Sequence, residues 1–264
     1  MNLIKSLVAS AALIASASAS ATYVNLSGPE TPNLQTVINN LYQSATCPTC
    51  SALTNAPDVN LNQAAELGTF AIEASGGSIS TMIIEVAGNA GSNTFGIYDL
   101  SNPNAFLQLF AGSDTNGGQV TLSVSDTFKF TSSKTIFDAN GDPVSSVFAS
   151  KQFASSSFGY YLATASGSKF YSQATLNAGG ADQMVAFQGD GDKIKVPTKP
   201  AAVWGSSSYI LAWEDQALAG SDQDYQDMVV YVESITPVPE PGSLALLALG
   251  LVGLASSARR KMRA

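Results

Sequence analysis

One acidic stretch holds the side chains of this chain that are best suited to bind a metal ion. It runs from Trp213 to Asp227 and contains five carboxylates: Glu214, Asp215, Asp222, Asp224 and Asp227. No Lys or Arg occurs from Pro200 to Ala258, so no nearby cation can pair with these acids. If the chain folds back here, Ca²⁺, a hard cation with about six to eight oxygen ligands, would relieve their repulsion. The stretch therefore predicts a calcium site, with a solvated acidic loop as the alternative.

The order of these acids along the chain sets a geometric condition for that site. On a continuing strand Glu214 and Asp215 would point to opposite faces, so both can bind one ion only if the chain turns there. The three aspartates that follow have a spacing that a tight loop can gather. Two strand-like runs, Tyr209–Trp213 and Met228–Val232, flank the stretch. We therefore expect a loop that folds back between these two strands.

Enzymatic chemistry has few candidates in this chain because histidine is absent. Its absence excludes Ser-His-Asp and Cys-His nucleophile systems, imidazole bases and the usual catalytic zinc sites. Glycoside hydrolysis by two carboxylates remains open. Twenty acidic residues make chance pairs easy, so their number is no evidence for an enzyme. We expect a non-catalytic protein.

The two cysteines, Cys47 and Cys50, form a Cys-Pro-Thr-Cys motif. Such a pair can be a redox dithiol, half of a metal site or a local disulfide. No second pair completes a metal site, and a helical pattern precedes the motif where a thioredoxin-like site would have a strand. We expect a small structural disulfide, as suits an exported protein.

Two further Asp-rich stretches are weaker metal candidates. Asp138–Asp142 begins like an EF-hand loop, but Pro143 and Ala149 stand where that loop needs Gly and Glu. Its Asn-Gly pair predicts a hairpin turn instead. Gly189–Asp192 likewise predicts a solvated turn.

The body of the chain is strongly acidic. From Thr22 to Glu240 it has seven Lys and no Arg against twenty Asp and Glu, a net charge of −13. A surface of this sign repels phosphate backbones, so we expect no nucleic-acid partner.

The hydrophobic pattern changes along the body. In residues 22–66, Leu34, Val37, Ile38 and Leu41 form one apolar stripe, which predicts a short helix opened by Thr31-Pro32. Residues 67–235 alternate or run in short apolar segments between turn signals, which predicts an all-β, single β-sandwich or jelly-roll-like domain of about nine or ten strands. The expected strands are 81–86, 94–98, 106–110, 120–124, 128–130, 157–162, 184–187, 209–213 and 228–232.

Both ends of the chain read as processed segments. Residues 1–21, with Lys5, an apolar stretch and Ala-x-Ala sites, predict a secretory signal peptide. Residues 236–264 form a tail, with a proline-rich turn, an apolar span at 243–258 and a basic end. As a helix the span is about 24 Å long, marginal for a hydrocarbon core of about 30 Å. The basic end would stay in the cytoplasm.

This tail resembles the PEP-CTERM sorting motif of exported bacterial proteins. The resemblance rests on three parts in order: Pro239, Glu240 and Pro241, then the apolar run, then Arg259, Arg260 and Lys261. It implies a Gram-negative bacterium that makes extracellular polysaccharide, Sec-dependent export, a transient stay in the inner membrane, and removal of the tail by an exosortase near Glu240. The protein would then reach the cell surface or extracellular matrix. A permanent single-pass anchor is the alternative.

The body resembles the DUF4114 family of exported bacterial proteins, which has no assigned activity. The resemblance rests on the Glu214-Asp215 pair and on Gly220–Val230, with weaker similarity at Thr94–Tyr98 and Phe158–Leu162. It implies a β-rich surface domain, covering most of residues 67–235, with calcium binding and no reaction.

Two functions follow as hypotheses. The first is a calcium-binding surface or matrix protein associated with extracellular polysaccharide. The second is a carbohydrate-binding module or a carboxylate-based glycan hydrolase, with Tyr160, Tyr161, Trp204 and Trp213 as stacking surfaces unless they belong to the core.

Overall fold

The computed structural model describes residues 26, 32–46, 56–64, 67–73, 78–84, 90–112, 114, 118–137, 142–197 and 199–239. These residues are mostly β-strand with one short helix, as expected, and they belong to a single compact unit that ends at Val238. The helices are α1 (Leu34–Thr46) and the 3-10 segments η1 (Ala90–Ser92), η2 (Ala174–Leu176) and η3 (Ala178–Gly180). The strands are β1 (Phe70–Ile72), β2 (Ser78–Ile84), β3 (Thr94–Asp99), β4 (Asn102–Ala111), β5 (Gln119–Val124), β6 (Lys129–Phe137), β7 (Pro143–Gln152), β8 (Ser157–Ala163), β9 (Lys169–Tyr171), β10 (Met184–Gln188), β11 (Lys193–Ile194), β12 (Ala202–Val203), β13 (Tyr209–Trp213), β14 (Met228–Val232) and β15 (Ile235–Pro237).

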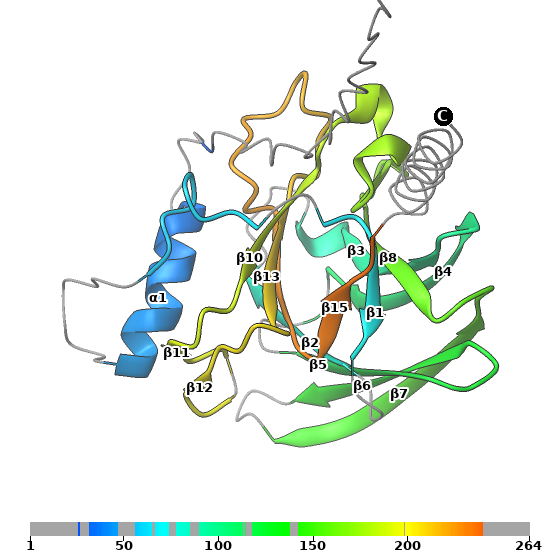
Figure 1. Ribbon diagram of the computed structural model, residues 1–264, viewed down its shortest axis with the longest axis horizontal. Coiled ribbons are helices and arrows are strands. Elements are labelled where there is room, and N and C mark those ends of the chain that lie inside the picture. Colours follow the sequence, from blue (N-terminus) through cyan, green and yellow to red (C-terminus); the bar gives the residue numbers. More distant parts are fainter. Residues whose placement is uncertain are drawn as a thin grey trace, which may run out of the picture. The chain divides into compact units, whose positions relative to one another are not determined.

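The strands form two large antiparallel sheets and one small pair (Figure 1). The six-stranded sheet has the order β15-β1-β8-β3-β4, with β9 beside the end of β8. The seven-stranded sheet has the order β10-β13-β14-β2-β5-β6-β7, and β11 pairs with β12. Both sheets contain strands from the two halves of the chain, so each sheet needs both halves to form.

The main core lies between the two large sheets. Side chains of alternate residues meet there, for example Phe95 of β3, Tyr160 of β8 and Trp213 of β13. The rings of Phe95 and Tyr160 stack with centroids 5.3 Å apart, and the edge of Trp213 meets Phe95 at 5.9 Å. Aromatic pairs at such separations add to the stability that burial supplies.

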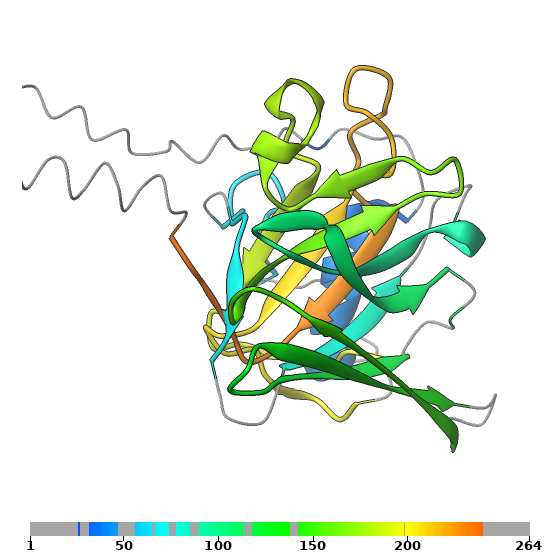
Figure 2. The same ribbon diagram turned by 90° about the vertical axis from the view of Figure 1, so that its right-hand side faces the viewer.

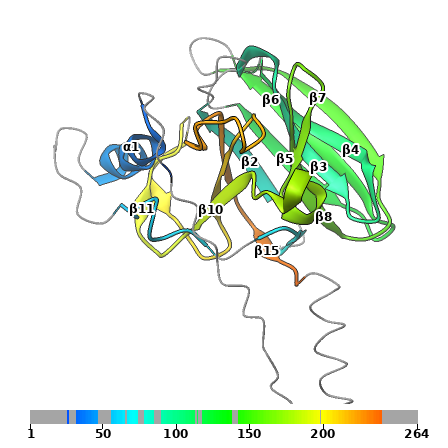
Figure 3. The same ribbon diagram turned by 90° about the horizontal axis from the view of Figure 1, so that it is seen from above.

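A second core covers the other face of the seven-stranded sheet. Helix α1 buries its apolar stripe there against the outward residues of β10, β13 and β14. Viewed from above, α1 and β11 lie on one side of β10 and β2, and β3, β4 and β8 lie on the other side (Figure 3). Strands β13 and β14 are therefore buried on both faces, which explains why their sequences are apolar at every position.

The start of α1 differs from the expected one. The helix begins at Leu34, and the side chain of Asn33 accepts a hydrogen bond of 2.9 Å from the backbone of Thr36. Asn33 therefore caps the first turn in the manner of Asn and Ser residues at helix ends. Thr31, the residue expected in that role, lies outside the described residues.

Some of the predicted features lie outside the described residues. These are the signal peptide at 1–21, Cys47 and Cys50, and the tail from Glu240 with its span at 243–258. Among the described residues, no helix has the length and apolar character to cross a membrane.

Candidate metal centre

The acidic loop, residues 214–227, leaves β13 and returns into β14. Trp213 and Met228 form the last paired residues of these two antiparallel strands, so Glu214 and Asp227 stand next to each other at the loop's base. The backbone N–H of Asp215 donates to Oδ2 of Asp227 at 2.7 Å, which closes the base. The loop (gold) projects from the same end of the sheets as η2 and η3 (yellow-green) in both Figure 1 and Figure 2.

Four of the five acids in the loop are buried. Glu214 has no exposed surface, and Asp215, Asp224 and Asp227 are at most 9% exposed, whereas Asp222 is exposed. Buried carboxylates are normally paired with a cation or bound to a metal. Among the described residues the one salt bridge joins Lys134 to Asp114, away from this loop. The buried acids therefore lack a protein cation.

The acids converge in two groups that share one residue. Carboxylate oxygens of Glu214, Asp222 and Asp224 lie within 4.8 Å of one another, and so do those of Glu214, Asp215 and Asp227. The sequence analysis required a turn at Glu214 and Asp215 if both are to bind one ion. The chain does bend at Asp215, and this brings the two carboxylates to one side. All five predicted residues thus gather around Glu214.

The strand end of the loop is held by polar contacts from distant parts of the chain. Nδ2 of Asn93 donates to Oδ2 of Asp215 at 2.9 Å. The backbone N–H of Glu214 donates to the carbonyl of Gln183 at 3.1 Å, and the Gln183 side chain donates to the carbonyl of Gln216 at 2.9 Å. These contacts orient the first turn of the loop. Asn93 and Gln183 are residues of the candidate site that the sequence analysis missed.

The other end of the loop is shaped by its backbone. Gln223 and Tyr225 have φ of 59° and 55°, a left-handed conformation that is uncommon for residues other than glycine. Tyr225 is fully buried in the core beneath α1. Between them, Asp224 accepts hydrogen bonds from the backbone and the side chain of Gln226 at 3.1 and 2.9 Å. This conformation turns the Asp224 carboxylate toward Glu214.

Glu214 is the least satisfied member of the cluster. Among the described residues its carboxylate oxygens have no hydrogen-bond partner other than the neighbouring carboxyl of Asp227, which can bond to Glu214 only when one of the two is protonated. Burial raises the pKa of Glu214 from 4.5 to about 9, and the negative charge of Asp227 adds to the rise. Burial also raises the pKa of Asp227 from 3.8 to about 7, against the lowering effect of the Asp215 N–H. The two carboxyls therefore retain a proton near neutral pH unless a cation replaces it.

The donor set fits a hard cation. It consists of carboxylate oxygens alone, without the nitrogen or sulfur ligands that zinc and copper sites use. Ca²⁺ accepts flexible geometry and completes its shell with carbonyls and water. The two carboxylate oxygens of Glu214 are the buried atoms that such an ion would satisfy.

The structure describes only some of the remaining predicted features, namely the two weaker metal candidates and the sorting residues. Asp138–Gly141 lies outside the described residues. Gly189–Asp192 is a turn, in which Asp190 accepts from the backbone of Asp192 at 2.9 Å and Gly191 has φ of 99°. Of the sorting residues only Pro239 is described, and its side chain is exposed.

The four aromatic residues considered as sugar-stacking surfaces are core residues. Trp204, Trp213 and Tyr160 have no exposed surface and Tyr161 is 2% exposed. None of these rings can stack on a ligand from outside. A carbohydrate site that uses them is therefore excluded by their burial.

Comparison with protein families identifies two segments of the chain. Residues 139–235 match the family described as a domain of unknown function, DUF4114. Residues 237–261 match the PEP-CTERM protein-sorting motif. Both resemblances are confirmed, although the DUF4114 match begins at 139 and leaves the earlier strands outside. No curated protein and no solved structure matches the chain. The sorting motif marks the chain as an exported protein that an exosortase sorts.

Proposed function

We propose that this chain is a non-catalytic protein of the cell surface or extracellular matrix whose acidic loop binds Ca²⁺. The observation that carries the proposal is Glu214, a fully buried acid at the meeting point of two groups of acids, whose oxygens have no partner among the described residues other than the carboxyl of Asp227. Protein interiors rarely keep such a group ionised without a cation. Glu214 would bind the ion with Asp222 and Asp224, with Asp215 and Asp227, or with both pairs.

Calcium would act on the stability of the domain. The ion would join the end of β13 to the start of β14 and replace repulsion between acids with attraction to a shared cation. Calcium sites of extracellular modules have dissociation constants of about 0.1–1 mM. At a tenfold excess over that constant, binding stabilises by about 1.4 kcal/mol, which raises Tm by about 3–6 °C for a domain of this size.

A carboxylate-based glycan hydrolase fits the same residues less well. The catalytic acids of such enzymes lie about 5–9.5 Å apart with the sugar between them. Here the oxygens lie within 4.8 Å of one another, and all but Asp222 are buried. That geometry leaves room for an ion rather than a sugar ring.

The last part of the proposal is the cellular location of the protein. The sorting motif supports export by the Sec machinery, a transient stay in the inner membrane and processing by an exosortase. The body, with a net charge of −13, would then stand at the cell surface of a Gram-negative bacterium, associated with its extracellular polysaccharide.

Calorimetric titration of the exported protein with Ca²⁺, after treatment with a chelator, tests the calcium site. We expect millimolar or tighter binding that Glu214→Gln abolishes, because a neutral amide removes the ligand shared by both groups. Asp126→Asn is the matched control, because Asp126 is an exposed acid in the turn between β5 and β6. Equal calcium binding by the two variants, or no binding by the wild type at several millimolar, would refute the proposal.

A further inference from the structure

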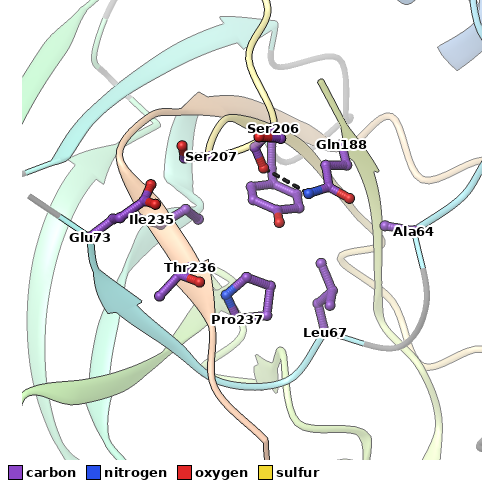
Figure 4. Close-up of a pocket in the computed structure, with 10 residues that line it drawn as sticks. Ala64, Leu67, Glu73, Gln188, Ser206, Ser207, Ile235, Thr236 and Pro237 are labelled. Atoms are coloured by element: carbon purple, nitrogen blue, oxygen red, sulfur yellow. Dashed lines mark hydrogen bonds between the residues drawn. The ribbon is translucent and has the colours of Figure 1, made fainter. Parts of the chain in front are cut away.

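A cavity of about 380 Å³ opens at the edge of the two-sheet core, between β15 of one sheet and β10 and β13 of the other (Figure 4). It shares no lining residue with the acidic loop, although Tyr209 and Ile235 lie only a few residues along the chain from that loop. Polar side chains surround it: the hydroxyls of Ser206, Ser207, Tyr209 and Thr236, the amide of Gln188 and the carboxylate of Glu73. Figure 4 shows Glu73 and Gln188 on opposite sides of the space, with Thr236 between them.

The wall of the cavity is held in place by hydrogen bonds. Nε2 of Gln188 donates to the carbonyl of Ser206 at 2.7 Å. The backbone N–H of Ile235 donates to the carbonyl of Ser207 at 3.1 Å, which joins β15 to the turn before β13. The site is therefore formed before any ligand arrives, which lowers the entropy cost of binding.

The lining is mixed: Ala64, Leu67, Ile235 and Pro237 form its apolar part, and six residues with polar side chains form the rest. A purely apolar ligand would leave those polar groups without partners, which is unfavourable. The volume is at the lower end of the range for small-molecule sites, about 300–1,000 Å³. Such a space holds one or two sugar rings rather than an extended chain.

The charge of the lining favours neutral polar ligands over anionic ones. Among the described residues, the lining contains one carboxylate, Glu73, and no Lys or Arg. Burial raises the pKa of the Tyr209 phenol, and the negative charge of Glu73 adds to the rise, so the phenol stays a neutral donor. An anionic ligand would meet Glu73 without a compensating cation. A neutral ligand rich in hydroxyls can both donate to and accept from this set.

From this lining we infer that the cavity is a binding site for a neutral saccharide unit of one or two rings. The sugar hydroxyls form hydrogen bonds with Thr236, Ser207 and Gln188. The apolar face of the sugar contacts Pro237 and Leu67. The negative charge of Glu73 repels acidic sugars. The site rests on the proposed placement of the domain beside extracellular polysaccharide, but it does not depend on calcium.

The test uses oligosaccharides released from the extracellular polysaccharide of the producing bacterium, separated by anion exchange into neutral and acidic fractions. Binding to the exported protein is measured by saturation-transfer NMR and calorimetry. We expect the neutral fraction to bind and the acidic fraction to bind at least about fivefold more weakly.

Three variants locate the site. Thr236→Val keeps the shape and strand propensity of an exposed residue and removes one hydroxyl, so binding of the neutral fraction should weaken about fivefold. Thr121→Val makes the same change on exposed Thr121 of β5 and should leave binding unchanged. Glu73→Gln should keep the neutral fraction bound and improve binding of the acidic fraction.

The inference is overturned if the neutral fraction does not bind at millimolar concentration, if Thr236→Val and Thr121→Val bind alike, or if the wild type prefers the acidic fraction. Calcium titration of the same preparations separates the two proposals. If the protein binds calcium but not the neutral saccharides, only the saccharide inference is refuted. If it binds the neutral saccharides but not calcium, only the calcium site is refuted.

Discussion

The backbone N–H of Asp215 and the Oδ2 of Asp227 are joined by a hydrogen bond of 2.7 Å across the base of the acidic loop. This bond links the residue that leaves β13 to the residue that enters β14. It places Asp227 beside Glu214, with a carboxylate oxygen within 4.8 Å of those of Glu214 and Asp215. The loop is therefore closed by one of its own acids before any ion binds.

The first prediction concerns that closing bond. Asp227→Ala should lower the free energy of unfolding by about 1–3 kcal/mol in chelator, because it leaves the buried Asp215 N–H without an acceptor. Asp227→Asn should cost less, since its amide oxygen can still accept and a repulsive charge is lost. Urea denaturation of both variants measures the difference. An equal loss in both would show that the charge of Asp227, and not its hydrogen bond, holds the loop.

The second prediction is a pH dependence of the calcium-free protein. The folded state raises the pKa of Glu214 to about 9 and that of Asp227 to about 7, mainly through burial. Between their ordinary values and these values the folded state binds more protons than the unfolded state, so stability falls as pH rises. Tm in chelator should therefore decline from about pH 5 to pH 9.

Glu214→Gln provides the control for this decline. Because the two carboxyls titrate as a coupled pair, removal of Glu214 should flatten the slope, also between pH 7 and pH 9. Saturating Ca²⁺ should remove it in the wild type, since the ion holds both carboxylates ionised. A slope in Glu214→Gln equal to that of the wild type would assign the dependence to other groups.

The strands that the sequence predicted best are those buried on both faces. Tyr209–Trp213 and Met228–Val232 were placed with the observed bounds, because a continuous apolar run leaves little choice of ends. Strand β7 was missed because residues 146–152 are all exposed at the edge of the sheet, so no hydrophobic alternation marks them. Edge strands are held by backbone hydrogen bonds, which a side-chain pattern does not reveal.

The five acids of the candidate site could be predicted because their signal also lies within one short stretch of sequence. Their number and the absence of nearby cations are local properties of one stretch. Asn93 was not predictable, because it lies 122 residues from its partner Asp215 and meets it only when β3 packs over the end of β13. The cavity beside β15 was also missed, since its lining combines residues of β10, β13 and β15 with residues of the segments around β1, and these share no motif.

The third prediction tests the packing of the six-stranded sheet. Gly159 of β8 lies under the ring of Tyr98, and a Cβ at this position would meet the ring at 2.3–2.4 Å. Gly159→Ala should therefore destabilise by about 1–3 kcal/mol through overpacking. Gly205→Ala is the control, because a Cβ there has no neighbour within 4 Å. Equal Tm values for the two variants would contradict the close contact.

The boundary between body and sorting tail is set by a contact at Val238. Its backbone N–H donates to the carbonyl of Thr69 at 2.9 Å, and the hydroxyl of buried Thr69 donates back to the Val238 carbonyl. Strand β15 ends at Pro237, so the folded body extends past Ile235, where the sequence had placed its end. The Pro239-Glu240-Pro241 segment thus begins one residue after this contact, and the contact itself lies inside the matched sorting motif.

The fourth prediction follows from this short distance. Replacing Pro239, Glu240 and Pro241 by Ala should leave a chain that keeps Arg259–Ala264 and stays with the inner membrane, because the exosortase no longer recognises its motif. Inserting a Gly-Ser linker between Val238 and Pro239 leaves the motif intact and moves it away from the folded body, so processing should persist. Intact-mass measurement on each cell fraction reports both results. A wild-type mature protein that still carries Arg259–Ala264 would mean that the tail is an anchor and not a removable signal.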